Sequence, residues 1–177
     1  AALYSNTSAR QVTCANNLTV TAGTVNTLSG AQPSTNLTVT ALTDVTGTLT
    51  LNGSAATFTG AVTINSGGTI GKNSGTGLTS FAGNVTVNAG GTFSHTGAGG
   101  TITQTGANKQ ITINGTGTIT GSVGNNITVN VSYALLFGNG STVSLQYVTI
   151  SQPGTLASDH ALQFGGSTNT ITQIDNV

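Results

Sequence analysis

The side chains that could perform acid, base or nucleophilic chemistry are few in this sequence. The carboxylates are Asp44, Asp159 and Asp175, the imidazoles are His95 and His160, and there is no Glu. An acid and a base for glycoside hydrolysis would have to come from three carboxylates that lie far apart in the chain. Asp159 and His160 are adjacent, but neighbouring residues of a strand point to opposite faces, so we expect a surface turn at this pair rather than catalysis.

The remaining candidate groups do not indicate a metal or a phosphate site. His95 stands between two small polar residues beside a glycine-rich stretch, and we expect it to be a solvated loop residue. The two histidines, Cys14 and the three aspartates lack zinc spacing, and no acidic calcium-binding repeat occurs. No lysine follows the glycines at 97–100, so this stretch predicts a turn. We therefore predict a protein without a cofactor and without enzymatic activity.

Charge is nearly absent, because the 177 residues include three Lys+Arg and three Asp+Glu. Ordinary soluble domains are roughly 25% charged. Arg10, Lys72 and Lys109 stand singly, so no basic stripe is available for nucleic-acid phosphates or for an anionic bilayer. The longest apolar run, residues 133–137, is far below the roughly 18 residues of a membrane span. We predict no nucleic-acid partner and no membrane insertion.

Cys14 is the single cysteine, so packing and hydrogen bonds rather than an intrachain disulfide must stabilise the fold. It is either a small buried hydrophobic residue or a disulfide partner for another subunit. The sequence begins Ala1-Ala2-Leu3 and contains no Met, which we interpret as a mature exported product. The predicted location is extracellular, at the cell surface or secreted.

A repeated phrase organises the chain. Residues 58–70 (FTGAVTINSGGTI) are echoed 23 residues later by residues 81–93 (FAGNVTVNAGGTF). A third, partial copy at 113–119 (INGTGTI) is displaced by a further 26 residues. Self-similarity at such a period is the sequence signature of a solenoid or a blade-like array.

Within each copy, apolar residues alternate strictly with polar ones. Val62 and Ile64 share one parity while threonine and asparagine take the other, which predicts a strand with one buried face. Stacked coils place equivalent residues above one another, so we expect Val62 near Val85 and a hydrogen-bonded ladder between Asn65 and Asn88. The predicted repeat core comprises Phe58, Val62, Ile64, Phe81, Val85, Val87, Ile111 and Ile113.

The strands end at Gly-Gly or Asn-Gly steps, where a positive φ costs little. The predicted turn glycines are Gly67, Gly68, Gly90 and Gly91. Asn-Gly also suits the hairpins of an antiparallel sandwich, but a sandwich has no reason to repeat one phrase at a fixed spacing. We predict an all-β fold, a parallel β-helix or β-solenoid with three short sides and about 20–26 residues per turn.

The two flanks depart from the repeat, and the C-terminal flank concentrates large apolar side chains. We predict an N-terminal cap or docking segment at 1–16, solenoid repeats at 17–132, and C-terminal turns or a cap at 133–177. A charge at Leu135 or Leu136 is expected to block assembly without unfolding the coil. The candidate self-association residues are Leu3, Tyr4, Tyr133, Leu135, Leu136 and Phe137.

The phrases at 62–69 (VTINSGGT) and 84–92 (NVTVNAGGT) resemble the repeat regions of bacterial surface adhesins and haemagglutinin-like secreted proteins. The likeness covers roughly residues 17–130. It implies a right-handed parallel β-solenoid carried outside the cell and used in adhesion or matrix, and it implies no catalytic residue. The chain departs from such adhesins in being short.

These observations predict a structural subunit of an extracellular fibre or matrix that associates end to end with copies of itself. One alternative is a monomeric adhesin repeat module, with surface glycans as partners. A further alternative is an ice- or carbohydrate-binding solenoid that uses outward threonines such as Thr116, Thr118 and Thr120. The uneven spacing of the strand cores, 19, 25, 23, 26 and 16 residues from residue 18 to residue 127, predicts that such threonine ranks drift out of line.

Overall fold

The structure is a computed structural model, described for residues 10–27, 35–51, 55–73, 77–97, 99–151, 161–166 and 168–175. These residues form twenty-one short β-strands and no helix. Among them, no helix is long and apolar enough to span a bilayer. The predicted all-β class is confirmed.

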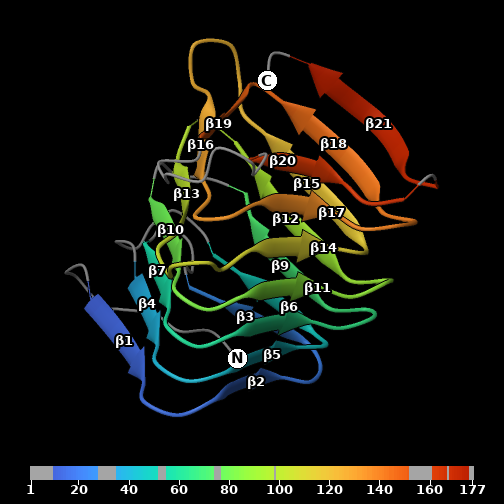
Figure 1. The fold of residues 1–177 in the computed structure, drawn as a ribbon. Coiled ribbons are helices and arrows are strands. Elements are labelled where there is room, and N and C mark those ends of the chain that lie inside the picture. Colours follow the sequence, from blue (N-terminus) through green and yellow to red (C-terminus); the bar gives the residue numbers. More distant parts are fainter. Residues whose placement is uncertain are drawn as a thin grey trace.

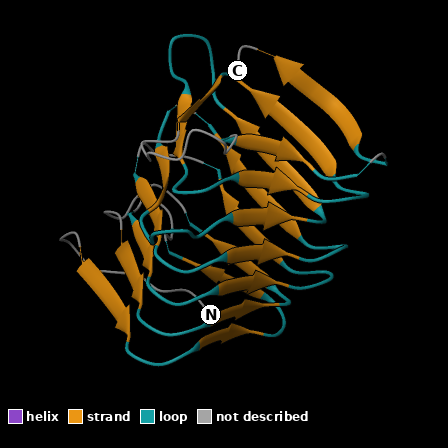
Figure 2. Ribbon diagram, in the orientation of Figure 1, coloured by secondary structure: helices purple, strands orange, loops and turns teal. Residues whose placement is uncertain are grey.

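Successive strands belong to three different parallel sheets, so the chain winds as a three-sided β-solenoid of stacked coils (Figures 1 and 2). Each sheet has seven strands and is named here after its first strand. The β1 sheet contains β1 (Arg10–Cys14), β4 (Thr35–Val39), β7 (Ala56–Phe58), β10 (Leu78–Phe81), β13 (Thr101–Gln104), β16 (Ile127–Asn130) and β19 (Val148–Ser151). The β2 sheet contains β2 (Leu18–Val20), β5 (Thr43–Val45), β8 (Val62–Ile64), β11 (Val85–Val87), β14 (Ile111–Ile113), β17 (Leu135–Phe137) and β20 (Leu162–Phe164). The β3 sheet contains β3 (Thr24–Asn26), β6 (Thr48–Thr50), β9 (Thr69–Lys72), β12 (Thr92–Thr96), β15 (Thr116–Thr120), β18 (Thr142–Gln146) and β21 (Thr170–Asp175).

The strand register follows the sequence repeat. Val85 pairs with Val62 in the coil before it and with Ile111 in the coil after it. Parallel pairing of equivalent positions stacks like residues at the roughly 4.8 Å strand spacing. The predicted solenoid and the predicted stacking of its repeats are confirmed.

The core lies between the three sheets and is filled by the inward residue of each alternating pair. All eight predicted core residues are buried. The rings of Phe58 and Phe81 stack with centroids 5.2 Å apart, and Phe93 packs edge-on against Phe81 at 6.3 Å. Burial of a large apolar side chain contributes about 1.5–3 kcal/mol, so this continuous column is the main source of stability.

The predicted turn glycines are required for two different reasons. Gly67 and Gly90 have φ of +79° and +78°, the left-handed region that favours glycine. At Gly68 a Cβ would lie 2.1 Å from the carbonyl oxygen of Val45 in the preceding coil, and at Gly91 it would lie 2.9 Å from that of Ile64. The first glycine of each pair therefore supplies the turn, and the second allows close stacking of the coils.

The coils extend beyond the predicted repeat segment of 17–132. In the N-terminal flank, β1 is already the first strand of its sheet, and in the C-terminal flank β17 to β21 continue all three sheets. Thus every strand that the structure describes in the two predicted caps belongs to the solenoid. Figure 1 shows β1 to β3 at one end of the stack and β19 to β21 at the other.

Candidate functional site

The carboxylates are dispersed over the described part of the molecule. Asp44 lies on the outer face of β5 and accepts a hydrogen bond from Nδ2 of Asn65, while Asp175 is exposed at the end of β21. Asp159 and His160 lie outside the described residues. Among the residues that are described, no group of three His, Cys, Asp or Glu side chains could hold a metal ion.

His95 is a buried core residue, so the prediction of a solvated loop position is wrong. It lies in β12 with 2% of its surface exposed, and it pairs with Lys72 of β9, which is equally buried. The alternation of the strand directs residue 95 inward, and in the next coil the same position is Ile119. Burial, with the charge of Lys72 as a second cause, lowers the pKa of His95 to about 4.

Lys72 is held inside the solenoid by its ammonium group, which donates a hydrogen bond to the carbonyl oxygen of Gly77. Burial lowers the pKa of Lys72 to about 8, because the charged form loses its hydration. Both groups face the core, so this pair bears on the stability of the fold.

The predicted asparagine ladder is confirmed on the outside of the corners. Nδ2 of Asn88 donates to Oδ1 of Asn65 at 3.0 Å, and Asn65 in turn donates to Asp44. These three residues follow one another through successive coils. The ladder satisfies polar side chains between coils, with Asp44 as its one acidic member.

Outward threonines of the β3 sheet lie in one unbroken rank, so the predicted drift is wrong. Each member is the first residue of its strand and pairs with the next member, because differences in repeat length are taken up in the corners between strands. All members are exposed or half-buried. The rank consists of Thr24, Thr48, Thr69, Thr92, Thr116, Thr142 and Thr170.

The predicted self-association residues do not form an end surface. Leu135 and Phe137 are fully buried in β17, which pairs with β14 on one side and β20 on the other. Leu136 points outward from a lateral face, and Tyr133 precedes β17 at a corner. A charge at Leu135 would therefore unfold the coil. Leu3 and Tyr4 lie outside the described residues.

Three of the six exposed large apolar side chains among the described residues lie on the last coil, whereas Leu42, Leu78 and Val123 lie singly on other coils. Phe164 of β20 is 40% exposed, and Ile171 and Ile174 of β21 are 52% and 44% exposed. These residues continue the inward rows of the core, because Phe164 stacks on Phe137 at 5.6 Å and Ile174 pairs with Leu145. The alternation of apolar and polar residues at 162–174 indicates strands with one apolar face. It does not indicate that this face is left uncovered, because it does not tell which coil is the last in the stack.

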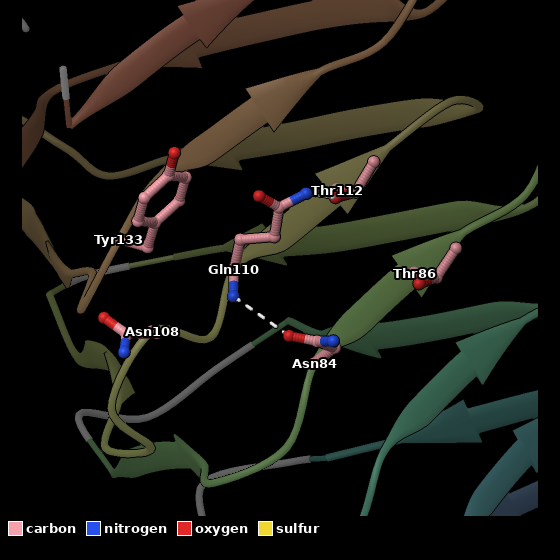
Figure 3. A pocket seen from close by; sticks show the side chains of 6 residues that line it. All are labelled: Asn84, Thr86, Asn108, Gln110, Thr112 and Tyr133. Carbon is pink, nitrogen blue, oxygen red and sulfur yellow. Dashed lines mark hydrogen bonds between the residues drawn. The ribbon is translucent and has the colours of Figure 1, made fainter. Parts of the chain in front are cut away.

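One pocket of about 420 Å³ opens on the β2 sheet. Figure 3 shows the ring of Tyr133 on one side of it, Thr86 and Thr112 on the other, and Gln110 between them. The sequence assigned Tyr133 to an interface and missed the pocket, because its residues come from three successive coils. The lining consists of Asn84, Thr86, Asn108, Gln110, Thr112 and Tyr133.

The described surface thus offers three places for function: the open face of the last coil, the threonine rank and the pocket beside Tyr133. Comparison of the chain with models of protein families, with curated proteins and with solved structures found no match.

Proposed function

We propose that this chain is a structural solenoid of an extracellular fibre or matrix, whose units associate end to end with copies of themselves. The observation that carries the proposal is the apolar surface of the last coil, formed by Phe164, Ile171 and Ile174. Large apolar side chains grouped on one face mark an interaction surface.

The backbone of the last coil supports the same reading. β20 and β21 are the final strands of their sheets, so one edge of each carries N–H and C=O groups without a strand partner among the described residues. Such an edge is a template for pairing with another chain. One further coil would complete the ladders and cover the three apolar side chains, and a second copy of the chain supplies it.

The first coil supplies a complementary surface. β1, β2 and β3 are the opposite edges of the same three sheets. Their inward residues Val12, Leu18 and Val25 are only partly buried and pack against the core. Contact of a last coil with a first coil is heterologous and does not close, so it generates a filament from one subunit type.

The lateral faces favour this arrangement because their exposed large apolar side chains, Leu42, Leu78 and Val123, lie singly on different coils. These faces carry mainly threonine, serine and asparagine, and the whole chain has a formal net charge of zero. An extracellular location is part of the proposal and is supported by this composition, which resembles that of secreted repeat proteins.

Negative-stain electron microscopy across a concentration series tests the proposal. We expect filaments whose length increases with protein concentration and whose width matches one solenoid. Discrete short rods at every concentration would contradict self-association and would favour a monomeric adhesin module.

A second candidate function is binding to an ordered lattice such as ice, and the threonine rank of the β3 sheet favours it. Parallel pairing spaces its hydroxyls at roughly 4.8 Å across the whole sheet. Ice-recrystallisation inhibition by the native chain, lost in Thr92→Lys/Thr116→Lys and kept in Thr57→Lys on the β1 sheet, would support this function. Equal activity of the native chain and both variants, or none in the native chain, would exclude it.

A further inference from the structure

The pocket beside Tyr133 has a structural cause in the corners between the β1 and β2 sheets. Three residues, 82–84, connect β10 to β11, but six residues, 105–110, connect β13 to β14. The extra length stands out from the face of the solenoid and forms one wall. Within it, Asn108 adopts a positive φ of 55°, a strained conformation that asparagine tolerates better than most residues.

This wall is fixed by the coils on both sides of it. The hydroxyl of Ser132, in the following coil, donates to the carbonyl oxygen of Gly106 at 2.6 Å and lies 2.9 Å from that of Lys109. In the preceding coil, Oδ1 of Asn84 accepts a hydrogen bond from the backbone N–H of Gln110 at 3.2 Å. A site held in this way loses little conformational freedom when a ligand binds.

Polar groups remain available inside the pocket. Nε2 of Gln110 donates to Oγ1 of Thr112 at 2.7 Å, which orients the amide and leaves its Oε1 as an acceptor. Among the described residues, Nδ2 of Asn84 and the hydroxyl of Tyr133 also have no hydrogen-bond partner. The pocket therefore presents at least one free acceptor, one free donor and a hydroxyl that can act as either.

The chemistry of the lining selects the kind of ligand. All six lining residues are uncharged, so nothing in the pocket pairs with a phosphate or a carboxylate. The ring of Tyr133 supplies a flat apolar wall with a polar tip. Hydroxyl-rich rings with one apolar C–H face match these features, and the volume of about 420 Å³ falls within the roughly 300–1,000 Å³ of small-molecule pockets.

We propose that this pocket binds a neutral saccharide, with Tyr133 stacking on one sugar ring and Asn84 and Gln110 hydrogen-bonding its hydroxyls (Figure 3). The site lies on a lateral face, away from the last coil. It is therefore independent of end-to-end association, and a filament would display one such pocket per subunit.

Saturation-transfer difference NMR tests the site with lactose, maltose and cellobiose as neutral probes and digalacturonic acid as an acidic one. At least one neutral disaccharide should give a saturation-transfer signal that levels off as the concentration of that disaccharide rises. Tyr133→Ala should weaken its binding at least tenfold, whereas Thr57→Ala, an outward threonine of the β1 sheet, should leave binding unchanged.

Circular dichroism establishes that each variant is folded. If Tyr133→Ala does not fold, Gln110→Glu takes its place, because the side chain is half-exposed and the change removes the donor to Thr112. The site is overturned if no neutral probe binds, if digalacturonic acid binds in preference to all three, or if the pocket variants bind as well as the native chain.

Discussion

At the scale of single residues, the unusual feature is a lysine and a histidine inside an otherwise apolar column. Lys72 and His95 occupy neighbouring inward positions of β9 and β12, which in the following coils are taken by Ile119 and Leu145. Burial disfavours the charged form of each group. This pair should therefore couple the stability of the fold to pH.

The free energy of unfolding should fall as the pH is lowered from 6.5 to 4. The pKa of His95 is about 4 in the folded chain and 6.5 in the unfolded one, so over this interval the unfolded state binds more protons. The shift corresponds to about 3 kcal/mol at most, at 1.36 kcal/mol per pKa unit. Urea unfolding followed at pH 7, 5.5 and 4 measures it.

His95→Ile is the matched control, because isoleucine occupies the same position one coil later. The variant should lose most of the pH dependence between 6.5 and 4. An unchanged slope would show that His95 does not titrate with unfolding.

The eight core residues predicted from the sequence are buried, but the prediction for His95 is wrong. Position 95 has the same parity as Phe93, but the small polar residues on either side of it and the glycine-rich stretch that follows favoured a loop. Only the register with Lys72 and Ile119 shows that the strand continues through this residue. Buried polar residues are therefore what pattern reasoning misses here.

At the scale of the elements, the corners decide how closely the coils stack. Gly68→Ala would place a methyl group 2.1 Å from a backbone oxygen of the preceding coil. Because a backbone atom cannot move aside cheaply, we expect the free energy of unfolding to fall by about 3 kcal/mol or more. Chemical denaturation of the variant measures this loss.

Gly124→Ala is the control for the effect of the turn itself. Gly124 has a φ of +75° but no atom within 4 Å of an added Cβ, so the cost is limited to left-handed backbone strain of about 1–2 kcal/mol. Equal losses in the two variants would contradict the close-stacking role of Gly68.

Strand type and register were predictable from the sequence because period-2 alternation and a 23-residue repeat act together at Val62 and Val85. The corners were not, since six residues at 105–110 replace the three at 82–84 without disturbing either strand. Because the corners absorb the differences in repeat length, the threonine rank of the β3 sheet stays aligned. The longer corner at 105–110 also forms a wall of the pocket at Tyr133. The length of a repeat alone therefore does not predict which side chains are aligned on the surface or where a pocket forms.

At the scale of the whole molecule, the solenoid has three sides formed by its three sheets and two unlike ends. The sequence placed the interface at 133–137, together with Leu3 and Tyr4, because these residues depart from the repeat, but Leu135 and Phe137 belong to the core. The exposed apolar residues of the last coil are Phe164, Ile171 and Ile174. They stand at strand positions that point inward and are buried in the preceding coil. Which inward residues remain uncovered depends on the number of coils, and the repeat pattern does not specify it.

End-to-end association is the central claim, and sedimentation velocity of Ile171→Lys/Ile174→Lys beside the native chain tests it most directly. The control is Val123→Lys, since Val123 is 77% exposed at a lateral corner and should not contribute. The account predicts concentration-dependent large species for the native chain and the control, and a folded monomer for the double variant. Large species of undiminished size in the double variant, or a native chain that stays monomeric at every concentration, would contradict it.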